Sequence, residues 1–197
     1  MFRYVAFVLA AGVATGFSTP AFADAGKVFD TLLSCRPDFF SVLKAEAPAL
    51  GRVKLETFAD PGNRQDDPDA KNVYAQIATF EKPVKAGDLS IVRYFQSATV
   101  QGGQPIGYSW ALQIAEQPEV IIRLLESRFD AKFARPWMFE GWSVDVSQTP
   151  DAGPLSPKLT IAPYDDPDRQ ATLTCDVDPD ATADMQPPDI RDLFGAP

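Results

Sequence analysis

Hydrophobic residues along this chain repeat first at helical spacing and then, for a long stretch, in alternation with polar ones. Apolar positions between Gly26 and Glu46 follow a helical period, interrupted by Pro37, so we expect two short helices with Pro37 at the break or in the first turn of the second. Alternation predicts four strands, over residues 52–58, 73–80, 89–100 and 106–114. A Gly-Gly pair at 102–103 predicts a hairpin between the last two strands.

The second half of the chain shows the same order of helix and then strands. An apolar stripe predicts a helix from Pro118 to Phe129, and shorter apolar runs predict strands over 137–146, 158–162 and 170–175. Together these elements predict an α+β fold, with helices packed on an antiparallel sheet.

The pattern also suggests how the chain is divided. We expect one α+β domain over 24–180 and a flexible, acidic, proline-rich tail over 181–197. A faint similarity between 26–116 and 117–180 raises the alternative of two tandem modules within that domain.

Residues 1–23 are typical of a secretory signal peptide. Arg3 is followed by an apolar run over 4–17, and Ala21-Phe22-Ala23 forms a small-x-small cleavage pattern. The apolar run is shorter than the roughly 20 residues of a stable membrane span. We therefore expect export to a bacterial periplasm, cleavage near Ala23 or after Ala25, and no membrane span in the mature chain.

The charge of the chain narrows the choice of partners. The sequence contains 18 Lys and Arg against 27 Asp and Glu, a net charge of −9, and removal of Arg3 with the leader makes the mature chain more negative still. Such a field repels nucleic acid phosphates and anionic lipid, and it attracts basic proteins. We expect a protein partner, most simply a basic one, and no nucleic acid.

Candidate chemistry is sparse. The chain has no histidine, which removes Ser-His-Asp and Cys-His catalysis. A calcium loop starting at Asp176 fails because Ala181 and Pro187 replace the required Gly and Glu. We therefore expect a protein that is not an enzyme, with no catalytic residues, no metal and no cofactor.

Two alternatives stay open for the function. A carboxylate-dependent glycoside hydrolase could use Glu116 and Glu140, which have Trp110, Trp137 and Trp142 nearby in sequence as sugar platforms. The same aromatic residues would suit a periplasmic carbohydrate or small-ligand binder.

The two cysteines, Cys35 and Cys175, are expected to form a disulfide, because an even number of cysteines in an exported protein favours pairing. This bond would tie the first helical region to the last predicted strand.

An aromatic segment supplies the candidate binding site. On a strand, Trp137 and Phe139 point to the face opposite Met138 and Trp142, so one face covers the core and the other needs a second layer or a partner. With Arg135 beside them, Trp137 and Phe139 are of the types enriched at binding hot spots. We expect a periplasmic, non-enzymatic binding protein, of the inhibitor or immunity type, that acts on a basic envelope partner through these three residues.

Overall fold

In a computed structural model of the chain, the residues described are 24–60, 71–129, 133, 142–145, 158–163, 171–177 and 186–195. They form helices and strands in this order: α1 Ala25–Leu33, α2 Asp38–Leu50, β1 Val53–Asp60, β2 Lys71–Ala86, β3 Leu89–Gln101, β4 Gln104–Ile114, α3 Pro118–Phe129, β5 Trp142–Asp145, β6 Lys158–Pro163, β7 Ala171–Val177 and α4 Ile190–Phe194. The α+β class predicted from the sequence is confirmed.

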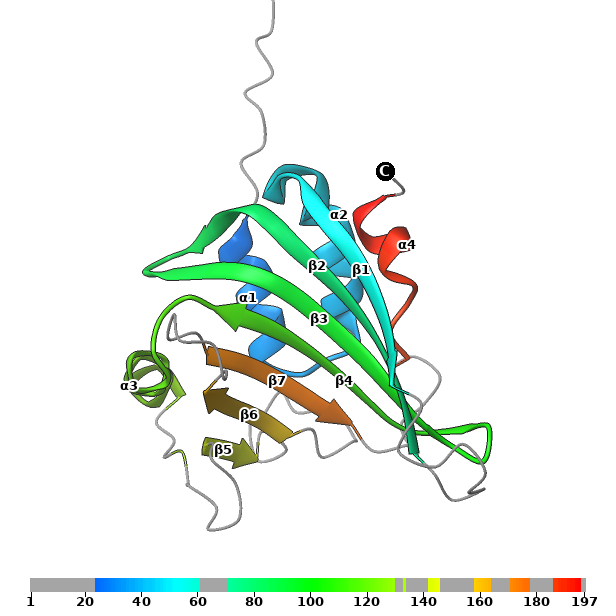
Figure 1. The fold of residues 1–197 in the computed structure, drawn as a ribbon. Helices are drawn as coiled ribbons and strands as arrows, with labels where there is room; N and C mark the ends of the chain where they lie inside the picture. Colours follow the sequence, from blue (N-terminus) through cyan, green and yellow to red (C-terminus); the bar gives the residue numbers. More distant parts are fainter. Residues whose placement is uncertain are drawn as a thin grey trace, which may run out of the picture.

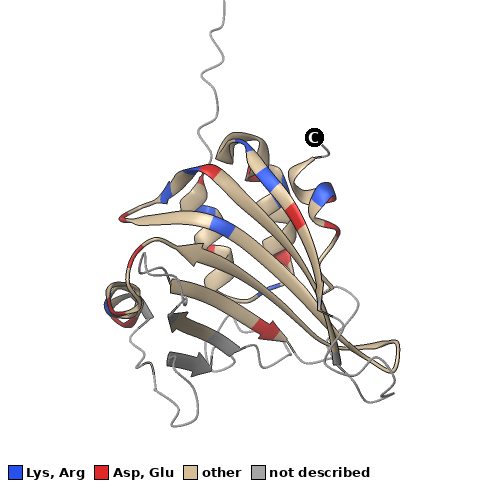
Figure 2. Ribbon diagram, in the orientation of Figure 1, with Lys and Arg blue, Asp and Glu red and all other residues tan. Residues whose placement is uncertain are grey.

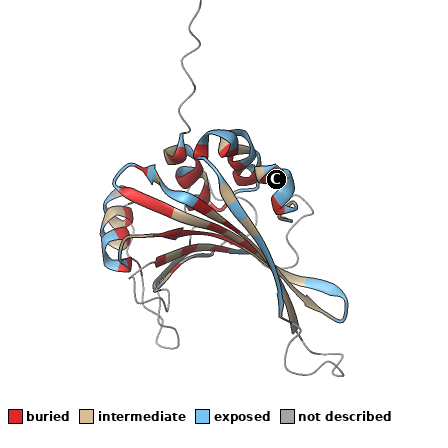
Figure 3. Ribbon diagram, turned by 45° about the horizontal axis from the view of Figure 1, so that its top comes forward, coloured by how far each residue is buried: buried red, intermediate tan, exposed pale blue. Residues whose placement is uncertain are grey.

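The strands form one seven-stranded sheet in the order β1-β2-β3-β4-β7-β6-β5, with every neighbouring pair antiparallel. The strands that follow α3 are thus added beside β4, and both parts of the chain share one sheet (Figure 1). The topology does not test the suggested internal repeat. Helices α1, α2 and α4 lie together on one face of the sheet, which we call the helix face (Figure 3).

Aromatic packing holds the helix layer to the sheet. Trp110 of β4 is fully buried, and its ring lies 5.1 Å from Phe40 and 6.5 Å from Phe39, both on α2. Phe39 also contacts Tyr94 of β3, at 5.9 Å between ring centroids. Because the alternation of β4 sends every second side chain the same way, Trp110 defines which residues of the central strands point to the helix face.

The predicted disulfide is present. Cys35, in the turn between α1 and α2, is bonded to Cys175 of β7 with an S–S distance of 2.06 Å, across 140 residues of sequence. Closing a loop of that length stabilises the fold by about 4–5 kcal/mol in the chain-entropy model. The bond joins the turn between α1 and α2 to β7, one of the strands that follow α3 in the chain.

Several elements extend beyond their predicted ends. Helix α2 continues through Pro48 to Leu50, because a proline in the last turn removes only one backbone hydrogen bond. Strand β2 continues to Ala86, past Pro83, where an irregular register between Thr79 and Val84 accommodates the missing N–H.

The end of the chain also differs from the expected tail. Within 181–197, the described residues 186–195 include α4, and its Ile190 and Leu193 are almost fully buried. Phe194 contacts Phe80 at 6.0 Å and Tyr94 at 5.8 Å between ring centroids. A short apolar motif in an acidic segment gives little periodicity, so its docking onto the helix face was not visible in the sequence.

Candidate binding site

The candidate site is on the helix face, where β2, β3 and β4 extend past the helices. Cross-strand pairing aligns Gln76, Gln96 and Trp110 in one row, and Tyr74, Ala98 and Tyr108 in the next. Trp110 is buried under α2, whereas Tyr74 is 52% exposed, so the helix layer ends between these rows.

A buried amide forms the inner wall. Gln96 is only 4% exposed, and its Nε2 donates to Oε1 of Gln76 at 2.7 Å and to the carbonyl oxygen of Pro188 at 2.5 Å. Its Oε1 accepts a hydrogen bond from the hydroxyl of Tyr94, at 2.5 Å. Burial raises the pKa of Tyr94 well above its ordinary value, so the hydroxyl keeps the proton that it donates.

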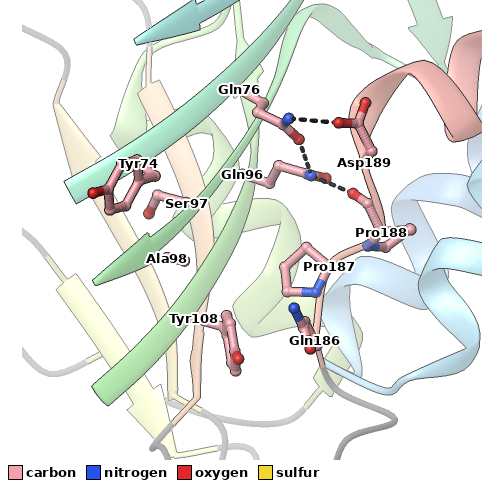
Figure 4. Close-up of a pocket in the computed structure, with 10 residues that line it drawn as sticks. All are labelled: Tyr74, Gln76, Gln96, Ser97, Ala98, Tyr108, Gln186, Pro187, Pro188 and Asp189. Atoms are coloured by element: carbon pink, nitrogen blue, oxygen red, sulfur yellow. Dashed lines mark hydrogen bonds between the residues drawn. The ribbon is translucent and has the colours of Figure 1, made fainter. Parts of the chain in front are cut away.

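The same amides hold the segment 186–189 against the sheet. The backbone N–H of Ile190 donates to Oε1 of Gln76 at 3.0 Å, and Nε2 of Gln76 donates to Oδ2 of Asp189 at 3.3 Å. Figure 4 shows Gln76 and Gln96 on the strands and the segment 186–189 facing them. Two distant parts of the sequence are thus joined by satisfied polar groups rather than by apolar packing alone.

Between these walls is a hollow of about 270 Å³. Its lining includes Tyr74, Tyr108 and, on the opposite side, Pro187. Ala98 lies between the two tyrosines in Figure 4, as the register requires. Two interstrand spacings separate the tyrosine backbones by about 10 Å. A flat or ring-shaped group fits between two aromatic side chains at that spacing, because the intervening residue is only an alanine.

The charge of the hollow is negative. Asp189 caps the N-terminus of α4, and the backbone N–H of Arg191, which donates to it at 2.8 Å, holds the pKa of this carboxyl below its usual value. Asp189 is therefore ionised at neutral pH. Among the described residues, none that lines the hollow is a lysine or an arginine. The site thus combines aromatic faces, amide groups and one carboxylate, a set that suits a cation or a neutral polar ring.

The site predicted from the sequence is made of other residues. Arg135, Trp137 and Phe139 lie outside the described residues, as does Glu140. The patch that they were expected to form stays a prediction.

Three residues of the alternative hydrolase or sugar site are described: Trp142 begins β5, and Trp110 and Glu116 have other roles in the fold. Trp110 is buried in the core and offers no platform to a sugar. Both carboxylate oxygens of Glu116 accept hydrogen bonds from Ser90, one from its backbone N–H at 2.8 Å and one from its hydroxyl at 2.9 Å. Lys85 donates to the same hydroxyl at 2.6 Å. These contacts connect the loop before α3 to the start of β3.

Sequence reasoning missed Tyr74, Gln76, Gln96 and the segment 186–189. Tyr108 lies in the strand predicted over 106–114 and alternates in step with Trp110, so the pattern alone does not distinguish it from a core residue. Only the register of three strands and the docking of α4 bring these residues together.

In the part of the chain that the structure describes, no cluster of three or more Cys, Asp or Glu is arranged to hold a metal ion. No helix among those residues has the length and apolar content of a membrane span. Comparison of the chain with protein-family models, with curated proteins and with solved structures found no match.

Proposed function

We propose that this protein is an exported, non-enzymatic binding protein, and that the hollow beside Tyr74 and Tyr108 receives a cationic side chain of a basic protein partner. The observation that carries the proposal is the lining of the hollow: two tyrosines and the ionised Asp189, with no basic residue among the described lining. A guanidinium is flat, stacks on aromatic rings and pairs with carboxylates.

The charge of the whole chain supports the same class of partner. A net charge of −9 attracts a basic protein over a distance and raises its association rate. A disulfide that closes 140 residues fits an oxidising compartment such as the periplasm. The aromatic segment with Arg135, Trp137 and Phe139 would add contact area in this proposal.

A neutral carbohydrate is the second candidate ligand. The specific observation in its favour is that Gln186 lines the hollow together with the two tyrosines, because amides and aromatic faces are what sugars commonly contact. Asp189 distinguishes the two candidate ligands. Its negative charge would stabilise a bound cation, whereas it would add little to the binding of a neutral sugar ring.

A titration monitored by NMR tests the proposal. The probes are the capped tripeptide Gly-Arg-Gly, the same peptide with citrulline in place of arginine, and a chitin trisaccharide. We expect the arginine peptide to shift the ring signals of Tyr74 and Tyr108, and citrulline, which is nearly isosteric but neutral, to bind at least about fivefold more weakly.

Matched variants locate the effect. Tyr108→Ala and Asp189→Asn should each weaken binding of the arginine peptide. Arg123→Gln on α3 should leave that binding unchanged. Equal binding of the arginine and citrulline peptides would contradict a cationic ligand. Shifts with the trisaccharide alone would favour the carbohydrate candidate instead.

A further inference from the structure

Strand β1 forms an edge of the sheet, and its hydrogen-bonding edge is open in the described structure. It pairs with β2 along all eight residues, and no described strand pairs with its other side. On the outer face, opposite the helices, β1 places Lys54, Glu56 and Phe58. Phe58 is 60% exposed, the most exposed large hydrophobic side chain that the structure describes. Residues 56–59 are all exposed, so the second half of the edge is accessible from both faces.

The pairing with β2 shows which backbone groups of β1 are unused. The carbonyl oxygen of Arg52 accepts a hydrogen bond from the N–H of Glu81, at 3.0 Å. In an antiparallel pair, both polar groups of a residue point to the same neighbour, and the direction alternates along the strand. Lys54, Glu56 and Phe58 therefore direct their backbone groups to β2, and Val53, Leu55 and Thr57 direct theirs to the open edge.

We propose that a second copy of this chain pairs its own β1 with this edge, antiparallel, around a two-fold axis at Leu55. Leu55 then exchanges two hydrogen bonds with Leu55 of the second copy. Val53 exchanges two more with Thr57 of that copy, and Thr57 exchanges two more with its Val53, on either side of the axis. All of the outward-pointing backbone groups from 53 to 57 acquire partners, and the two sheets become one.

The side chains of the outer face are complementary in this register. Lys54 of each copy lies opposite Glu56 of the other, and Arg52 lies opposite Phe58. These are positions without direct backbone hydrogen bonds, where facing side chains come closest, with Cα atoms about 4.5 Å apart. Within one copy, Lys54 Nζ already donates to Oε1 of Glu56 at 2.9 Å. The pairing therefore joins two such ion pairs into a network of four alternating charges, and it adds two contacts of a guanidinium with an exposed aromatic ring.

Neighbouring registers lack this complementarity. An axis at Glu56 places Glu56 opposite Glu56 of the second copy, and an axis at Lys54 places Lys54 opposite Lys54. An axis at Val53 places Arg52 opposite Lys54 of the second copy. An axis at Thr57 sets the Glu56 carboxylate against Phe58, whose ring face is negative. Since the pleat allows only such whole-residue steps, Leu55 is the centre that the charges select.

The helix face contributes an apolar seam. Val53 and Leu55 are half-buried, and with Phe194 they line a groove of about 820 Å³ between β1 and the ends of α2 and α4. In the proposed dimer, the two grooves meet on the same side of the joined sheet, and the second copy covers the apolar side chains that line them.

Sedimentation equilibrium of the mature protein tests the proposal through charge exchange. The wild-type protein should dimerise. Lys54→Glu sets four glutamates together across the axis, and Glu56→Lys sets four lysines together, so each should weaken dimerisation by at least about tenfold. The double variant Lys54→Glu/Glu56→Lys restores opposite charges and should return the dissociation constant to within about threefold of the wild type.

Controls separate this result from misfolding and from general charge effects. Arg123→Glu makes the same change of sign on α3 and should leave the dimer intact, and thermal melts should show all variants folded. A wild-type protein that stays monomeric to about 200 µM, a concentration typical of such measurements, overturns the proposal. Failure of the double variant to recover overturns it as well. As a second measurement, Leu55→Cys should form a disulfide-linked dimer on oxidation, and Ala59→Cys should not.

Discussion

At the scale of single residues, buried amides have contrasting roles in this protein. Gln96 and Gln113 are each 4% exposed. The Nε2 of Gln96 has two acceptors, whereas the Nε2 of Gln113 has no hydrogen-bond partner in the described structure. An amide that joins two segments stabilises the fold, while a buried donor without an acceptor destabilises it.

This contrast predicts opposite effects of the same substitution. Gln96→Leu leaves the hydroxyl of Tyr94 and the carbonyl of Pro188 without their partner, and should lower the free energy of unfolding by about 2 kcal/mol. Gln113→Leu removes an unpaired donor and should cost less than about 1 kcal/mol, or stabilise. Urea denaturation of both variants measures the difference. Equal losses would show that the hydrogen bonds of Gln96 do not add to the stability of the fold.

The aromatic segment predicts a second comparison between residues. Trp110 is a core residue, so Trp110→Ala should lose about 3–5 kcal/mol. If Trp137 belongs to a partner-binding patch, Trp137→Ala should cost little stability and instead weaken partner binding. A melting temperature for Trp137→Ala as low as that of Trp110→Ala would place Trp137 in the core and end the patch hypothesis.

At the scale of elements, local pattern explains what the sequence predicted and what it did not. The hairpin of β3 and β4 was predictable because its glycines and its alternation lie within 30 residues of chain. The insertion of β7 beside β4 was not, because strand order depends on contacts across long loops. The pair of tyrosines was missed for the same reason, since Tyr74 and Tyr108 meet only through β3.

Helix α4 should be sensitive to acid. Its cap, Asp189, has a lowered pKa in the folded protein, chiefly because the backbone N–H of Arg191 donates to it. A depressed folded pKa adds stability above the unfolded-state pKa, and this stability is lost as the pH falls through the folded value. We therefore expect α4 to loosen below about pH 4, the unfolded-state value.

The δ1-methyl NMR signal of Ile190 reports this change, because Ile190 follows the cap and is buried. Asp189→Asn keeps an oxygen at the cap and removes the titration, so its Ile190 signal should not move over the same range. An identical pH profile in the variant would show that another group controls α4. Gln76 also donates to Asp189, so the ring signals of Tyr74 and Tyr108 should move together with Ile190.

At the scale of the whole molecule, charged residues are few along the described central strands of the sheet. In Figure 2, coloured segments of both signs lie on β1, near the turn between β2 and β3 and on the helices, and long parts of the central strands have neither sign. The proposed partner site and the proposed dimer edge are at different places on this surface. The hollow lies over β2 to β4 beside the segment 186–189, and the dimer uses the free edge of β1, its outer face and the groove at the ends of α2 and α4. Both can therefore be occupied in one assembly, and a dimer would present two hollows to a basic partner.

The start of the mature chain gives the last prediction. Cleavage after Ala23 would make Asp24 the N-terminus, and its backbone nitrogen lies 3.1 Å from Oε2 of Glu46. The side chain of Asp24 also caps α1 by accepting from the N–H of Lys27 at 3.0 Å. Cleavage after Ala25 would remove both contacts. If residues 1–23 act as a signal peptide, cleavage after Ala23 keeps both contacts of Asp24, and we expect intact-mass measurement of the processed protein to give a chain that begins at Asp24. A mass corresponding to Gly26 would contradict this prediction, and recovery of the uncleaved chain would contradict the signal peptide itself.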